Sequence, residues 1–171
     1  SKQVAKDYLI WPALTGPFFV STLIGNAGAN LIRNVWTYSI IFCGHFPSGT
    51  QTFTAEECQN ETKGQWYLRQ MLGSANIEGS DLFHIMSGNL SHQIEHHLFP
   101  DVPANRYPEM APEVEAICQK YGLPYNTGPL RKQLGSTWIK IAKLSLPNAM
   151  TRDDNDVIVN IERTPAAVDA A

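Results

Sequence analysis

Two apolar stretches stand at the N-terminal end of the chain, and a more polar sequence follows them. Residues 9–32 contain no ionisable side chain, and residues 34–55 contain no Asp, Glu, Lys or Arg. A helix needs about 20 mostly apolar residues to cross the hydrocarbon core of a bilayer, because its backbone must satisfy its own hydrogen bonds there. The pattern therefore predicts a pair of transmembrane helical segments over residues 8–46, the second beginning near Ala27 with Arg33 inside it.

The first stretch also contains helix-disrupting residues. Pro12, Gly16 and Pro17 are expected to kink its helix without ending it. A pair of buried helices in a soluble protein would show the same apolar pattern, and that alternative stays open at this stage.

Beyond residue 46 the pattern predicts an all-α cap over residues 47–148. Thr54 begins a sequence with the spacing of a capping box, which favours a helix start. One continuous helix is expected over residues 82–98, and another from Pro112 to a stop at Gly122.

Composition narrows the function classes. The 171 residues are 43% hydrophobic and 17% charged with a net charge of -3, which excludes a basic nucleic-acid-binding protein. The three cysteines form no paired motif, so we expect reduced thiols instead of a disulfide framework. Residues 149–171 offer little to pack and are predicted to be a disordered tail.

The histidines are strongly clustered. All five lie between His45 and His97, and three of them fall within residues 92–97. On a helix, Gln93, His96 and His97 occupy positions i, i+3 and i+4 and share one face. Imidazole nitrogen is a good ligand for iron or zinc. The clustering therefore predicts a single metal site.

The sequence around these histidines resembles a known family. Residues 93–97, QIEHH, followed by LFP, resemble the third histidine box (QxxHH) of membrane fatty-acid desaturases of the front-end and bacterial acyl-CoA type. Residues 43–47, CGHFP, resemble the segment after the last membrane span of that family, where a further histidine is supplied. The likeness runs from about residue 7 to residue 147 and is strongest to acyl-CoA desaturases of the mycobacterial type.

The resemblance implies a fold and a site. The family has four membrane helices under a cytosolic helical cap, and two iron ions are held by histidines from three boxes. It implies that His45, His96 and His97 are iron ligands and that Gln93 occupies a ligand position. The HxxxH and HxxHH boxes that precede the QxxHH box in the family are not found before residue 92. The chain is therefore expected to be a C-terminal part with an incomplete diiron site, inactive alone.

The resemblance also implies the reaction. The expected activity is O2-dependent dehydrogenation of an acyl chain in lipid metabolism, carried out by an integral membrane protein whose active site is cytosolic. Electrons would come from a cytochrome b5-like protein, a ferredoxin or an NAD(P)H-dependent reductase. The substrate would be a fatty acyl-CoA or an acyl lipid. The sequence does not determine the double-bond position, the chain length or the roles of His84 and His92.

Other interpretations compete with this one. Residues 92–96 also match H-x-x-E-H, the motif of a class of zinc metalloproteases. A fatty-acyl hydroxylase of the same superfamily would use the same residues. A membrane-anchored scaffold without enzymatic activity would account for the apolar stretches but not for the histidine motif.

Overall fold

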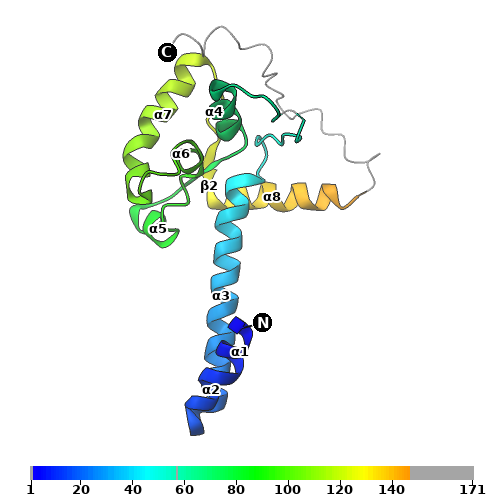
Figure 1. Cartoon of the computed structure of the whole chain (residues 1–171), viewed down its shortest axis with the longest axis vertical. Helices are drawn as coiled ribbons and strands as arrows, with labels where there is room; N and C mark the ends of the chain where they lie inside the picture. Colours follow the sequence, from blue (N-terminus) through cyan, green and yellow to red (C-terminus); the bar gives the residue numbers. More distant parts are fainter. Residues whose placement is uncertain (1, 57, 147–171) are drawn as a thin grey trace. The chain divides into compact units, whose positions relative to one another are not determined.

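The computed structural model describes residues 2–56 and 58–146, which are mostly helical (Figure 1). The elements in chain order are α1 (Lys2–Ala5), a π-helical turn (Lys6–Ile10), α2 (Trp11–Leu14), a 3₁₀ turn (Gly16–Phe18), α3 (Phe19–His45), α4 (Lys63–Leu72), β1 (Asn76–Glu78), α5 (Asp81–Met86), α6 (Gln93–Leu98), a 3₁₀ turn (Ala104–Arg106), α7 (Tyr107–Tyr121), β2 (Thr127–Pro129) and α8 (Leu130–Leu144). The chain divides into two compact units between Ser39 and Ile40.

The N-terminal unit is a helical hairpin. Its first helical segments run back alongside α3 (Figure 1), and the chain reverses in the 3₁₀ turn. Gly16 in this turn has a φ of +54°, a left-handed conformation that glycine adopts without a steric penalty. Asn26 Nδ2 donates to the backbone oxygen of Asp7 at 2.6 Å, and Asn30 Nδ2 donates to the hydroxyl oxygen of Tyr8 at 3.0 Å. Polar side chains thus connect the two arms.

The second helix of the apolar region begins at Phe19, earlier than the expected start near Ala27, and Arg33 lies within it. Helix α3 continues through this residue as a single helix of 27 residues. Arginine is a good helix former, so its charge does not interrupt a helix, whereas the Gly16-Pro17 sequence does end one. Within the described residues, no helix combines the length and the apolar character that crossing a bilayer requires.

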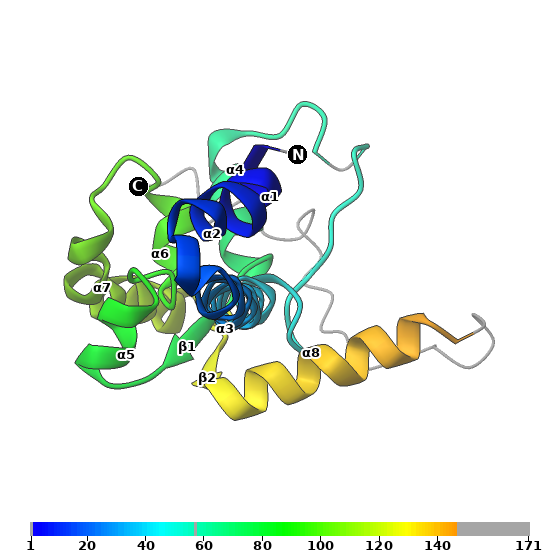
Figure 2. The ribbon, with the colours of Figure 1, turned by 90° about the horizontal axis from the view of Figure 1, so that it is seen from below.

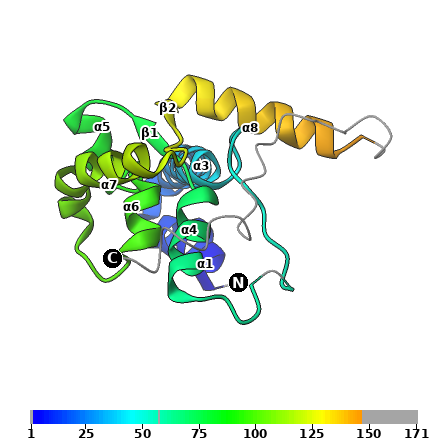
Figure 3. The ribbon, with the colours of Figure 1, turned by 90° about the horizontal axis from the view of Figure 1, so that it is seen from above.

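The C-terminal unit is built around helix α6. This helix lies between α4 and α7, and both contact it (Figure 3). The buried side chains of the core come from these three helices: Leu68, Met71, Leu72, Ile94, Val114 and Cys118. The helical character predicted for residues 47–148 is confirmed for the described part of that range.

A small parallel sheet accompanies the helices. Strands β1 and β2 pair with Asn76 opposite Thr127 and Glu78 opposite Pro129. Helix α8 follows β2 directly and contacts both strands (Figure 2). The sequence did not predict this sheet, because strands of three residues are too short to show an alternating pattern.

Two of the predicted helices differ in the structure. Residues 82–98 form two helices, α5 and α6, instead of one, because the chain turns between them. Gly88 and Asn89 have φ values of 64° and 58° there, which a continuing helix does not allow. The helix predicted from Thr54 begins later, as α4, where Thr62 is its N-cap.

The last predicted helix is partly confirmed. It ends at Gly122, which has a φ of 65° as a left-handed cap, but as α7 it begins at Tyr107 and not at Pro112. Pro108 stands in its first turn, where proline is favoured. The predicted tail of residues 149–171 lies outside the described residues.

Candidate metal centre

Helix α6 carries three of the four predicted metal ligands, and Asn76 of β1 fixes its start. The Asn76 side-chain oxygen accepts a hydrogen bond from the Ile94 backbone N–H at 2.9 Å. Its Nδ2 donates to the Glu95 carboxylate at 2.8 Å and to the Tyr125 hydroxyl at 2.7 Å. The Asn76 backbone oxygen accepts from the Gln133 amide at 3.2 Å. One asparagine therefore connects the sheet, α6 and α8.

His97 of α6 faces His45, the last residue of α3. Their Nε2 atoms lie 3.0 Å apart, and the ring planes are inclined by 74°. Both side chains are half-buried. The structure thus brings together two predicted ligands that are separated by 52 residues in the chain.

The opposite ring nitrogens show which tautomers are present. His45 Nδ1 lies 2.8 Å from the Ile41 backbone oxygen, and His97 Nδ1 lies 3.2 Å from Gln70 Oε1. Both oxygens can only accept, so these contacts favour the tautomer in which Nδ1 carries the proton and Nε2 keeps its electron pair. Burial, and then the nearby His45 and His96, lower the pKa of His97 to about 4, so this ring is neutral at physiological pH.

Two electron pairs that point at each other repel, unless a cation lies between them. Nitrogen ligands lie about 2.1 Å from a transition metal, and two of them at a right angle are then about 3.0 Å apart. The observed separation of the two Nε2 atoms is 3.0 Å. The donor set of His45 and His97 therefore fits a shared metal ion.

The Nδ1 atom of His96 also has a polar partner, which belongs to α7. Its Nδ1 lies 3.1 Å from the hydroxyl oxygen of Tyr107, which donates its own proton toward the Phe99 backbone oxygen at 3.5 Å. With the hydroxyl proton directed to Phe99, the hydroxyl oxygen can accept from His96 Nδ1, and in that tautomer the Nε2 of His96 keeps its electron pair. The rings of His96 and His97 have their centroids 5.7 Å apart.

Gln93 is buried, with 2% of its surface exposed, and its Oε1 has no hydrogen-bond partner among the described residues. An unpaired amide oxygen in the interior costs about 1–3 kcal/mol. A side chain at position 44 would lie 2.9 Å from Gln93 Cδ, so Gly44 makes the space that this residue occupies. An oxygen kept without a partner in a buried site fits a ligand position.

These residues are too few for a complete site. Over residues 2–56 and 58–146, no three or more His, Cys, Asp or Glu side chains are placed to hold one metal ion. His45, His96, His97 and Gln93 remain the candidate donors for a metal centre.

The remaining two histidines, His84 and His92, which were not among the predicted ligands, form a pair of their own. The rings of His84 and His92 have their centroids 4.6 Å apart. Both direct Nδ1 toward the hydroxyl of Ser91, at 2.7 Å for His84 and 3.5 Å for His92. Ser87 donates to the same oxygen at 3.2 Å. Burial, and then His84, lower the pKa of His92 to about 4.

Glu95 is fully buried, which bears on the H-x-x-E-H interpretation. Its carboxylate oxygens accept hydrogen bonds from Asn76 and Tyr125, each at 2.8 Å. Burial raises its pKa, although these hydrogen bonds act in the opposite direction. A general base has to reach a water molecule at the metal. The geometry of Glu95 therefore supports a structural role in holding α6.

The sequence did not identify the residues that hold the ligands. Asn76 and Gln70 are distant in the chain and belong to no motif. Polar residues of this kind are recognisable only once the contacts are known. A partial signal was available for Tyr107, since residues 105–107, Asn-Arg-Tyr, extend the resemblance to the desaturase motif.

Comparison with known proteins defines the class. The model of the fatty acid desaturase family matches residues 1–129, which is more than half of the chain. The chain therefore belongs to the fatty acid desaturase family, as its histidine motif had indicated. No solved structure matches it.

Individual relatives are similar to different extents. A protein of Mycobacterium tuberculosis named NADPH-dependent stearoyl-CoA 9-desaturase is 54% identical over 159 residues, which cover 91% of this chain and 37% of that protein. Mouse fatty acid desaturase 2-like protein FADS2B is 30% identical over 134 residues, 77% of this chain and 26% of the relative. Human fatty acid desaturase 3 is 30% identical over 131 residues, 71% of this chain and 28% of the relative. The chain thus spans between about a quarter and little more than a third of these relatives.

Proposed function

We propose that the complete protein is a fatty-acyl desaturase that introduces a double bond into a saturated acyl chain. Membership of the desaturase family supports this reaction. Two hydrogen atoms leave adjacent carbons, and O2 takes them up with two electrons and two protons to give two water molecules. A fatty acyl-CoA is the proposed substrate, because a relative with 54% identity is named a stearoyl-CoA desaturase.

The observation that carries the proposal is the arrangement of His45 and His97. Each ring has its Nδ1 within hydrogen-bond distance of a fixed oxygen, and the two Nε2 atoms lie 3.0 Å apart. Neutral imidazoles held in this way are ready to bind a metal ion without losing a proton first.

Two iron ions are the proposed cofactor. Bound iron would supply, with O2, an oxidant strong enough to take hydrogen from an unactivated methylene, which no side chain provides. His45, His96 and His97 would donate their Nε2 atoms, and Gln93 would contribute Oε1. Four donors cannot fill the coordination of two irons. We therefore expect the 171 residues alone to be inactive.

The electrons would come from a separate protein. NADPH is the proposed source, because the mycobacterial relative is named NADPH-dependent, and a reductase would then transfer the electrons. The candidate centre lies on half-buried side chains, so a docked donor protein would not need to open the core.

We also propose a location in a membrane, with the active site on the cytosolic side. Large apolar side chains of the N-terminal unit are more than half exposed, and exposed apolar surface of this extent is typical of contact with lipid or protein. They are Val4, Leu9, Ile10, Trp11, Leu14, Phe18, Val20, Ile24, Leu31, Ile32 and Val35. Basic residues favour the cytosolic side of a membrane, and the C-terminal unit carries several of them on its surface. They include Arg106, Lys120, Arg131 and Lys132.

The test uses the complete protein, expressed in membranes and supplied with stearoyl-CoA, O2, NADPH and a reductase. A monounsaturated product by mass spectrometry and about two irons per chain by elemental analysis are expected. A hydroxylated product would identify a hydroxylase instead. Zinc in place of iron, with peptidase activity, would overturn the proposal in favour of a metalloprotease.

A further inference from the structure

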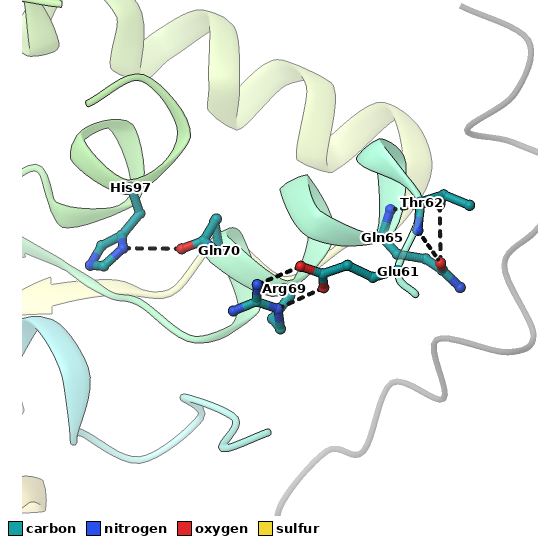
Figure 4. A network of polar contacts seen from close by, with 6 residues as sticks. All are labelled: Glu61, Thr62, Gln65, Arg69, Gln70 and His97. Carbon is teal, nitrogen blue, oxygen red and sulfur yellow. Dashed lines mark hydrogen bonds and ion pairs between the residues drawn. The ribbon is translucent and has the colours of Figure 1, made fainter. Parts of the chain in front are cut away.

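The Nδ1 atom of His97 contacts the side chain of a glutamine from a different helix. Gln70 lies near the end of α4, and its Oε1 is 3.2 Å from His97 Nδ1 (Figure 4). The two residues are 27 positions apart in the sequence, and no motif includes Gln70.

Gln70 is itself held in place by the way α4 is anchored. Thr62 and Gln65 form a reciprocal capping box at the start of this helix. The Arg69 guanidinium binds both carboxylate oxygens of Glu61, at 2.8 and 2.6 Å (Figure 4). The neighbouring Met71 and Leu72 are buried in the core. The amide of Gln70 therefore meets His97 from a rigid support.

The position of this amide determines what His97 can do. If Nδ1 carries the proton, Nε2 keeps the electron pair that faces His45. If the contact were lost, the proton could move to Nε2, where it would form a hydrogen bond with His45 Nε2 at the observed 3.0 Å. In that state the ring could not bind a metal through Nε2.

We propose that Gln70 is a positioning residue that fixes the tautomer and the ring plane of His97, so that Nε2 remains an electron-pair donor toward a metal ion. The metal part of this inference rests on the proposed function, whereas the tautomer part does not. Partners of this kind outside the ligand shell typically change metal affinity by about 10- to 100-fold.

The experiment compares three variants of the complete protein. Gln70→Met removes the acceptor but keeps the length of the side chain, and Gln70→Glu restores an acceptor. Gln65→Met is the matched control, because it removes a capping contact from the same helix without touching His97. Two readouts are needed: the protonated nitrogen of His97 from ¹⁵N resonances of the metal-free protein, and the iron bound after equilibration with graded Fe²⁺ buffers.

We expect Gln70→Met to lower iron affinity by about 10- to 100-fold and to populate the Nε2-protonated form of His97. Gln70→Glu should keep Nδ1 protonated and retain iron, since a carboxylate is a stronger acceptor. Gln65→Met should change neither quantity, although it lowers the unfolding temperature.

Each other outcome has a definite meaning. Unchanged tautomer and affinity in Gln70→Met would overturn the proposal, and so would an equal loss in Gln65→Met, because the effect would then belong to helix stability. If the unsubstituted protein binds no iron while His97 carries its proton on Nδ1, the proposed function fails and the positioning role remains.

Discussion

Two histidine pairs occupy different regions of the C-terminal unit, and their surroundings are opposite in kind. His45 and His97 bind oxygens that can only accept, which leaves their Nε2 electron pairs facing each other at 3.0 Å. His84 and His92 share a serine hydroxyl, which can donate to one ring and accept from the other. The rings of the first pair meet directly through their Nε2 atoms, whereas those of the second are linked through a hydroxyl.

The difference teaches that proximity in the sequence does not define a metal site. His92 is closer in the chain to His97 than His45 is, yet its Nδ1 belongs to a different hydrogen-bonded group. Whether a histidine can bind a metal ion depends on the hydrogen-bond partner of the ring nitrogen that does not face the metal. This partner determines which of the two nitrogens carries the proton and which can act as a ligand.

The largest effect is expected at the first pair. His97→Ala and His45→Ala should each remove bound iron and acyl desaturation from the complete protein. Removing a residue that only holds a ligand typically lowers metal affinity by about 10- to 100-fold, and removing a ligand itself should lower it further. Elemental analysis and product formation in the same cells measure both quantities. If either variant kept its full iron content, the His45–His97 pair would not differ from the His84–His92 pair in metal binding.

The next effect separates folding from metal binding. Asn76→Ala removes the hydrogen bonds that fix the start of α6 and leaves the buried Glu95 carboxylate and Ile94 N–H short of partners. We expect a loss of about 3 kcal/mol in the free energy of unfolding. Chemical denaturation of the purified protein measures it. Asn126→Ala, on a more exposed part of the same network, is the control and should cost less than about 1 kcal/mol. If Asn76→Ala lowered the free energy of unfolding as little as Asn126→Ala, the stability of α6 would not depend on its contact with β1.

A smaller effect is expected at the second pair. His84→Ala and His92→Ala should keep iron and lower activity by no more than about tenfold, since each removes one hydrogen bond to Ser91, worth about 1 kcal/mol. The same iron and product assays apply. If His92→Ala abolished iron binding while His96→Ala retained it, the ligand assignment on α6 would be wrong and the H-x-x-E-H interpretation would gain support.

The smallest effect concerns the support of the first pair. The Arg69 guanidinium lowers the pKa of Glu61 below its ordinary 4.5. The folded protein thus favours the carboxylate, and this stabilisation is present above pH 4.5 and is lost as the pH falls through the lowered value. Glu61→Gln should cost about 0.5–1 kcal/mol at neutral pH, because the pair is partly exposed.

The pH dependence provides the control for that variant. Unfolding free energies measured from pH 7 down to about pH 3 should converge for Glu61→Gln and the unsubstituted protein as the carboxyl becomes protonated. A difference that stays constant over this range would show that the ion pair does not stabilise α4.

Some features could be predicted from the sequence and others could not, for physical reasons. The ligand candidates His45, Gln93, His96 and His97 follow from a motif, because metal binding restricts residue types at fixed spacing. Gln70 contacts His97 through a fold that brings separate helices together, and no local pattern encodes such a contact. The division of residues 82–98 was recognisable, since the Ser-Gly-Asn sequence before α6 contains turn-forming residues.

The first residues of the helices were harder to predict from the sequence than the presence of the helices. Thr54 has capping-box spacing, but the capping box that forms is at Thr62, where Gln65 reciprocates. Both sites satisfy the local pattern, and the packing of α4 on α6 decides between them. Pro112 does not begin α7 but lies inside it, where its missing N–H removes one backbone hydrogen bond of the helix.

The contact between Gly44 and Gln93 has a consequence for how this protein can vary. The Gly44 backbone oxygen accepts from Ala75 N–H at 2.9 Å, and a Cβ at this position would lie 2.9 Å from Gln93 Cδ. Any larger residue would push α6 away from His45 and lengthen the separation of the two ring nitrogens. Evolution can therefore replace Gly44 only together with position 93, so the two positions should covary among functional relatives.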